Sequence, residues 1–139
     1  MLQLTAILKA HHLKVTPQRL SIFKMLRQTS SHPSAETIYN SLIDEHPTMS
    51  LATVYKTLDA FVQHGLIQQL NLGEDHYRYD ADASNHAHIQ CTVCKSVMDV
   101  PEFKQVAELR DEVSALTTYK LLNEQLYFYG VCPECQEKP

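Results

Sequence analysis

The sequence predicts an α+β fold in two small domains, a helical domain closed by a strand hairpin and a smaller domain of strands with one helix. Three observations support this prediction. Capped segments with helical spacing of apolar residues precede residue 65, two short strand-like segments follow them, and strands rich in Cys and His come after Asp80. A chain of 139 residues with 44% hydrophobic content can bury one ordinary core or two small ones.

The first two helices are expected over residues 2–12 and within residues 15–28, where apolar residues recur with helical spacing. In the second helix, Thr16 is a good N-cap and Pro17 suits the first helical position. The apolar stripe of this helix consists of Leu20, Ile22, Phe23 and Leu26.

Two further capped helices are expected. Ser34 can cap residues 35–46, and Pro47 forbids continuation of that helix. Ser50 can cap the next one, and Gly65 supplies a left-handed stop. The inward-facing residues of the two helices are Ile38, Leu42 and Ile43, then Val54, Leu58, Phe61 and Val62.

A strand hairpin is expected next, with strands at residues 66–72 and 76–81 joined through residues 73–75. Helices followed by such a hairpin make a winged helix-turn-helix. Helix spacing alone would fit a generic helical core with a hairpin equally well, because many folds contain two short capped helices.

Beyond Asp80, strands are expected at residues 86–90, 95–100 and 120–130, and a helix at 101–116 that begins with Pro101. The residues on one side of that helix are Phe103, Val106, Leu109 and Val113. We therefore expect a first domain at residues 1–80, a polar hinge at 81–85 and a second domain at 86–139.

Charge is unevenly distributed along the chain. The net charge of −4 arises within residues 81–139, which carry five Lys or Arg against nine Asp or Glu. Five cations precede the first acid, Glu36, so a basic N-terminal face and an acidic C-terminal half suggest two separate functions. Apolar runs fall far short of the ~20 residues of a membrane span, and we find no export signal, so a cytoplasmic location without a membrane partner is expected.

Four cysteines form two knuckles, Cys91-x-x-Cys94 and Cys132-x-x-Cys135. In a reducing compartment thiolates bind metal more readily than they form disulfides, and four thiolates in a tetrahedron favour Zn²⁺ with no open position for catalysis. Two disulfides or a thioredoxin-like pair are the alternatives. The latter needs one such motif at a helix start, whereas both knuckles adjoin predicted strands.

The histidines predict a second metal site. On a strand, His86 and His88 point to the same face and can bind one ion together. Imidazole and carboxylate form a harder donor set than thiolate and suit Fe²⁺, Mn²⁺ or Zn²⁺, so we expect a second site and not an extension of the thiolate site. Asp80 and Asp99 are candidate oxygen ligands nearby, although either residue taken alone is typical of a solvated carboxylate. His32 taken alone is typical of a loop residue or a helix-entry contact.

The chain resembles the ferric uptake regulator family of metal-responsive DNA-binding repressors. The motifs that carry the resemblance are "VTPQR", "HPSAETIY", "SLATVYKTL", "GLI", "HYRYD", "HAHIQCTVC" and "YGVCPEC", in the family's order. The resemblance implies an N-terminal winged helix, a C-terminal α+β dimerisation domain, and a homodimer on double-stranded DNA with an inverted-repeat operator.

The resemblance also implies that one regulatory ion, Fe²⁺ or Mn²⁺, is held by His32, Asp80, His86, His88 and Asp99. One ion would then tie the two domains together, and its binding would shift the population toward a dimer competent for DNA. Iron sensors of the family typically carry Glu at the position of Asp99. Asp there resembles the peroxide-sensing branch, in which iron oxidises a ligand histidine matching His32 or His86 and repression is lost. An iron or manganese sensor without peroxide chemistry is the alternative.

Other positions depart from the iron regulators. Asn85, Ala87 and Val106 stand where a third metal site has ligands, so no third site is expected. Lys56 stands where the peroxide branch often has Asn and the iron branch Arg, so the resemblance does not predict the operator sequence.

DNA contacts are expected from the helix that Ser50 caps. Ser50 and Thr53 would meet phosphates, Tyr55 could pack on thymine methyl groups, Lys56 could reach guanine acceptors, and Arg19 would touch the backbone. The alternative for Tyr55 is a partly buried core aromatic.

Two functions of other classes remain open from the residues. A metallohydrolase would use the His and Asp ligands to activate water, but we find no dedicated general base, and we expect a protein that is not an enzyme. A zinc-ribbon interaction module would bind its partner equally well without His86 and His88.

Overall fold

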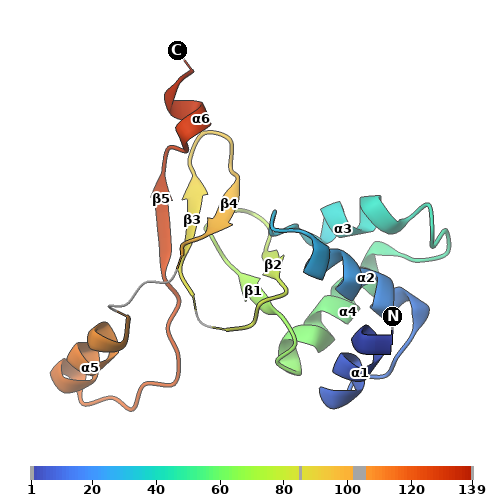
Figure 1. The fold of residues 1–139 in the computed structure, drawn as a ribbon, viewed down its shortest axis with the longest axis horizontal. Coiled ribbons are helices and arrows are strands. Elements are labelled where there is room, and N and C mark those ends of the chain that lie inside the picture. Colours follow the sequence, from blue (N-terminus) through green and yellow to red (C-terminus); the bar gives the residue numbers. More distant parts are fainter. Residues whose placement is uncertain (1, 85, 102–105, 139) are drawn as a thin grey trace. The chain divides into compact units, whose positions relative to one another are not determined.

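The computed structural model describes residues 2–84, 86–101 and 106–138. The chain forms two compact units, Met1–Ala83 and Ser84–Pro139. The first contains four helices and a hairpin, and the second contains a small sheet with two helices (Figure 1). The α+β class expected from the sequence is confirmed.

The first two helices are α1 (Leu2–Ala10) and α2 (Pro17–Gln28). The hydroxyl of Thr16 accepts a hydrogen bond from the amide of Arg19 at 3.1 Å, so Thr16 is the N-cap and Pro17 the first helical residue, as expected. The cap satisfies one of the amides that a helix start leaves without a helical partner.

The helix-turn-helix pair is α3 (Ala35–Leu42) and α4 (Leu51–Gln63). Ser34 accepts from the amide of Thr37 at 3.3 Å, and Ser50 accepts from the amide of Thr53 at 3.1 Å. After α4, Gly65 has a φ of +73°, a conformation that costs glycine little and other residues more. Both caps and this stop agree with the sequence.

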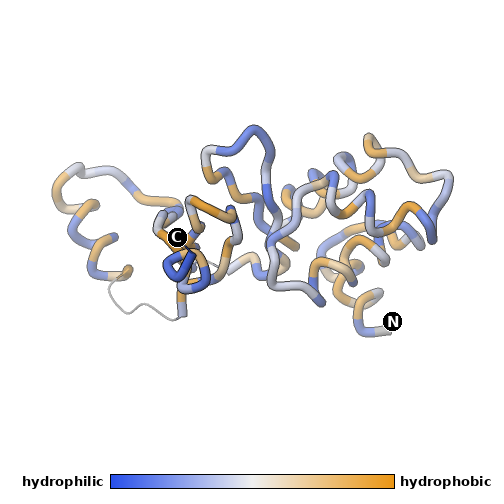
Figure 2. The backbone as a smooth tube through the Cα atoms, turned by 90° about the horizontal axis from the view of Figure 1, so that it is seen from above, coloured by the Kyte–Doolittle hydropathy of each residue, from blue (hydrophilic) through white to orange (hydrophobic). Residues whose placement is uncertain are grey.

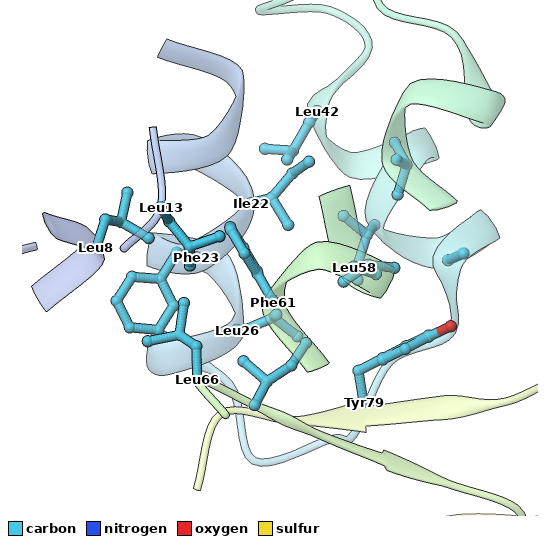
Figure 3. Packing of buried hydrophobic residues seen from close by; sticks show 14 of the residues in the cluster. Leu8, Leu13, Ile22, Phe23, Leu26, Leu42, Leu58, Phe61, Leu66 and Tyr79 are labelled. Carbon is cyan, nitrogen blue, oxygen red and sulfur yellow. The ribbon is translucent and has the colours of Figure 1, made fainter. Parts of the chain in front are cut away.

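The apolar faces of α2, α3 and α4 meet in one core (Figure 3). Phe23 and Phe61 pack edge to face with ring centroids 6.0 Å apart. Ile38, Val54 and Leu58 are fully buried, whereas Ile43 and Val62, also expected inside, are only half-buried.

The hairpin consists of β1 (Gln68–Leu70) and β2 (Arg78–Asp80), which pair antiparallel. Tyr79 turns its ring into the helical core, and its amide donates to the carbonyl of Pro33 at 3.0 Å. The hairpin is thereby attached to the start of α3. Four helices closed by a hairpin that packs on them constitute a winged helix-turn-helix.

The second unit is built on a three-stranded sheet in the order β4-β3-β5. β3 (His88–Cys91) pairs antiparallel with β4 (Val97–Asp99) and parallel with β5 (Tyr127–Gly130). The expected strands at residues 86–90 and 120–130 are longer than the observed ones. His86 and Ala87 precede β3, but the carbonyl of Ala87 still accepts from Val100 at 2.9 Å, so the chain remains paired there.

Two helices complete this unit. The longer helix, α5, is Val106–Thr117, and Phe103, named on one side of the expected helix, lies outside the described residues. Apolar and polar residues alternate along α5 (Figure 2), yet none of its described side chains is buried. The short helix α6 (Pro133–Gln136) was not expected from the sequence. Among the described residues, no helix has the length and apolar character required to cross a membrane.

We predict that Leu58→Ala lowers the free energy of unfolding of the N-terminal unit by about 2–5 kcal/mol, because the substitution removes buried methyl groups and leaves a cavity. Urea unfolding followed by circular dichroism measures this change. Gln63→Ala on the exposed side of the same helix is the control and should change stability by less than about 0.5 kcal/mol. Equal stabilities of the two variants would contradict the assigned core.

Candidate metal centres and nucleic-acid interface

Four thiols converge at one end of the C-terminal sheet. The sulfur atoms of the two knuckles lie within 4.8 Å of one another, and the Sγ atoms of Cys94 and Cys132 are 3.9 Å apart. Cys91 ends β3, and Cys135 lies on α6, whose N-cap is Cys132. All four are free thiols, so the disulfide alternative is not what the structure has. The donor set is the one that a tetrahedral Zn²⁺ prefers.

Hydrogen bonds shift the pKa values of three of these thiols. The amides of Cys132 and Cys94 donate to the sulfur of Cys91 at 3.4 and 3.5 Å and lower the pKa of that thiol to about 6. The hydrogen bond with Ser96, at 3.1 Å, lowers the pKa of Cys94. The hydrogen bond with Cys132 instead raises the pKa of Cys135 to about 12. A bound dication reverses that effect, because a coordinating thiol loses its proton.

His86, His88 and Asp99 converge within the C-terminal unit. The β3–β4 register pairs His88 directly with Asp99. One oxygen of Asp99, Oδ1, lies 3.1 Å from Nε2 of His86 and 3.2 Å from Nε2 of His88, and the two imidazole centroids are 4.4 Å apart. His88 is buried, whereas the Asp99 side chain is 46% exposed. Two imidazoles and a carboxylate aimed at one point can bind a divalent ion.

His32 and Asp80 converge within the N-terminal unit. Nε2 of His32 lies 3.2 Å from Oδ2 of Asp80, and both residues are buried. The other carboxylate oxygen accepts from the amide of Asp82 at 2.9 Å, which fixes the carboxyl group. Buried imidazole and carboxylate at this distance supply donors of the same kinds as the C-terminal group.

The five expected regulatory ligands therefore form two groups, one in each unit.

The other expectation about metals concerns the third site. Ala87 and Val106 carry no ligand atoms, and Asn85 lies outside the described residues.

Two exposed polar groups mark the start of α4. The hydroxyls of Ser50 and Thr53 lie 3.0 Å apart, and Ser50 also caps the helix. Lys56 is exposed one turn further along. The N-terminal turn of a helix attracts phosphate because its amides point outward and its dipole is positive there.

Tyr55 is next to Lys56 in the sequence, and it is 36% exposed. Its hydroxyl donates to Oε1 of Glu36 on α3 at 2.6 Å. The bond lowers the pKa of Glu36 and raises that of Tyr55, since it stabilises the carboxylate and the protonated phenol. The ring is thereby held between the two helices of the helix-turn-helix.

Arg19, the remaining expected DNA contact, donates from Nη1 to the carbonyl of Lys14 at 3.1 Å.

Two residues that hydrogen-bond to expected site residues were not predicted from the sequence, Ser96 beside Cys94 and Glu36 beside Tyr55. Ser96 follows Cys94 by two positions, and a hydroxyl so near a knuckle is a usable signal for a thiolate donor. Glu36 carries no comparable signal, because its pairing with Tyr55 depends on how α3 packs on α4.

Comparisons with known proteins identify the relatives of this chain. Residues 10–129 match the model of the Ferric uptake regulator family. The chain is 46% identical over 135 residues to Transcriptional regulator PerR of Clostridium acetobutylicum, covering 97% of each chain. It is 33% identical to Peroxide-responsive repressor PerR of Staphylococcus aureus over 133 residues, covering 96% of this chain and 89% of the relative.

The fold likewise matches the solved structure of the Helicobacter pylori ferric uptake regulator Fur, with a TM-score of 0.80 and 25% identity over 97% of this chain and 95% of the other. That protein is described as having three functional metal-binding sites. The family model spans most of the chain and includes the winged helix, the histidine group and the first knuckle. The chain belongs to the ferric uptake regulator family.

Proposed function

We propose that the protein is a metal-dependent, DNA-binding transcriptional repressor that senses peroxide through iron-catalysed oxidation of a ligand histidine. The observation that carries the proposal is the convergence of His86 and His88 on one oxygen of Asp99. The names of the two PerR relatives, at 46% and 33% identity, support the peroxide branch.

The proposed regulatory site takes His32 and Asp80 from the N-terminal unit and the other three ligands from the C-terminal unit. These donors, three imidazoles and two carboxylates, fit Fe²⁺ or Mn²⁺. An arrangement that brings the two groups to one ion binds it more tightly than an arrangement that separates them. Occupancy would therefore favour the first arrangement by the difference in binding free energy.

The proposed oxidation requires that peroxide reach the bound iron. The His86 side chain is 16% exposed and the Asp99 side chain 46%, whereas His88 is only 1% exposed. Fe²⁺ in this site would reduce peroxide and generate an oxidant beside its own ligands, which Mn²⁺ does not readily do. His86 is the more open of the two C-terminal imidazoles, in keeping with its expected role as a target.

The proposed DNA surface combines α4 with the basic face of the N-terminal unit. Ser50 and Thr53 would bind phosphate, Tyr55 would contact thymine methyl groups, Lys56 would read guanine, and Arg19 would contact the backbone. Glu36 holds the Tyr55 hydroxyl, which leaves the ring fixed for an apolar contact.

The proposed active form is a homodimer on an inverted repeat. The C-terminal unit exposes a set of large apolar side chains that includes Leu109, Val113 and Leu116 on α5 and Phe128 and Tyr129 on β5. Exposed apolar side chains gathered in one small unit are typical of an oligomer interface. Two copies of α4 would then meet successive turns of the major groove.

The cysteine cluster is proposed to hold structural Zn²⁺. We predict that Cys94→Ser releases this zinc and unfolds the C-terminal unit, because structural zinc contributes about 10 kcal/mol or more, comparable to the stability of a small domain. Metal analysis together with amide hydrogen exchange measures both effects. Thr92→Ser, in the same knuckle, removes no ligand and should retain one zinc per chain. A zinc-free C-terminal unit that stays fully folded would contradict the assignment.

The peroxide proposal is tested on zinc-loaded protein given Fe²⁺ and then a stoichiometric peroxide pulse. Peptide mass analysis should find one added oxygen on His32 or His86, together with loss of DNA binding, while the four cysteines stay unmodified. The exposed His12 controls for oxidation by diffusing species and should remain unchanged. Protein loaded with Mn²⁺ should bind DNA and resist the pulse.

Intact histidines after the pulse would contradict the peroxide proposal. If binding to DNA still depends on the metal, the protein is then an iron- or manganese-sensing repressor. Turnover of a hydrolysable substrate without metal-dependent DNA binding would instead indicate a metallohydrolase.

A further inference from the structure

Three consecutive residues of strand β2 contact His32 and Pro33, the two residues that precede the N-cap of α3. Arg78 donates from Nη1 to the carbonyl of His32 at 3.4 Å. The amide of Tyr79 donates to the carbonyl of Pro33 at 3.0 Å, and the carboxylate of Asp80 lies 3.2 Å from the His32 imidazole. The His32–Pro33 segment is thus held by main chain and side chains of one strand.

The backbone of His32 requires such support. Its φ is +55°, in the left-handed region that residues with a Cβ rarely adopt. The residue that follows is Pro33, and a residue before proline is normally confined to extended conformations. Strained backbone of this kind persists only where surrounding contacts enforce it.

Arg78 also joins this segment to Glu74, which lies between β1 and β2. Its Nε and Nη2 donate to the two carboxylate oxygens of Glu74 at 2.8 and 3.3 Å, which is a bidentate pair. Both side chains are largely buried, with 16% of Arg78 and 14% of Glu74 exposed. The remaining nitrogen, Nη1, is directed at the His32 carbonyl by the rigidity of the guanidinium plane.

We propose that Arg78 is a positioning residue that holds His32 in the conformation in which its imidazole faces Asp80. This inference rests on the proposed function, since it concerns a proposed ligand of the regulatory ion. With the imidazole already directed in the free protein, binding the ion requires less ordering of the chain. Glu74, between β1 and β2, anchors Arg78, so the same guanidinium supports both the hairpin and His32.

The test replaces Arg78 with Lys. Lysine keeps the charge near Glu74, but its single ammonium group cannot reproduce the planar fork that bonds Glu74 and the His32 carbonyl together. Loss of a residue that orients a metal ligand commonly weakens binding 10–100-fold, so we expect Arg78→Lys to bind Mn²⁺ about tenfold or more weakly than wild type. Electron paramagnetic resonance of free Mn²⁺ measures this in zinc-loaded protein.

Ser21→Ala is the matched control for a loss of stability alone. It removes a half-buried hydrogen bond between Ser21 and His46, 2.9 Å long, in the same unit but away from His32. At a temperature where every variant is fully folded, the control should bind Mn²⁺ like wild type. Glu74→Gln is a milder second variant, because it keeps the Arg78 guanidinium but removes the negative charge that anchors it. It should also weaken Mn²⁺ binding relative to wild type.

A second measurement needs no regulatory metal. If Arg78 fixes the His32–Pro33 segment, the Tyr79 amide should exchange with solvent faster in Arg78→Lys, while the amide of Leu58 in the core of α4 is unchanged. Wild-type Mn²⁺ affinity and wild-type Tyr79 exchange in Arg78→Lys would overturn the proposal. Absence of any Mn²⁺ binding by the wild type would refute the proposed function, and the exchange result would then decide the role of Arg78 by itself.

Discussion

The register of β3 is the constraint on which both candidate metal centres depend. This four-residue strand carries His88 at its start and Cys91 at its end. A tight turn after Cys91, closed by hydrogen bonds of 3.0 Å from Lys95 to Cys91 and 2.9 Å from Cys91 to Ser96, sets how β4 returns along β3. That return places Asp99 opposite His88. A slip of one residue would turn the ligands to the opposite face of the sheet.

The two centres are thus linked through the backbone but differ in donor chemistry. The thiol cluster lies near the positions where β3 and β5 end and β4 begins, and the same sheet presents the imidazoles to Asp99. Because no side chain is shared between the centres, the proposed regulatory ion could be lost, or its ligands oxidised, while the thiol cluster stays unchanged. In the N-terminal unit, the corresponding fixed element is β2, which directs Asp80 to His32 and Tyr79 to the core.

Much of this could be predicted from the sequence because it depends on local chemistry. Thr16, Ser34 and Ser50 cap their helices through contacts three residues away, and cysteines three apart form a knuckle wherever they fold. The expectations that differ from the structure depend on packing between helices and strands, which the spacing of residues in the sequence does not report. The strand expected at residues 120–130 is restricted to Tyr127–Gly130, where β3 offers partners. The described apolar side chains of α5 are exposed or half-buried in the single chain, which helical spacing alone does not report.

The central claim is that one regulatory ion controls binding to DNA. Its most direct test is the affinity of zinc-loaded protein for an inverted-repeat duplex, selected from random sequences with the Mn²⁺-loaded protein, as Mn²⁺ is titrated. Wild-type affinity should rise by about 5–150-fold, the usual range of coupling between sites. His88→Ala, folded and with its zinc retained, should show no rise. Equal affinity with and without Mn²⁺ in the wild type, or an unchanged response in His88→Ala, would contradict the account.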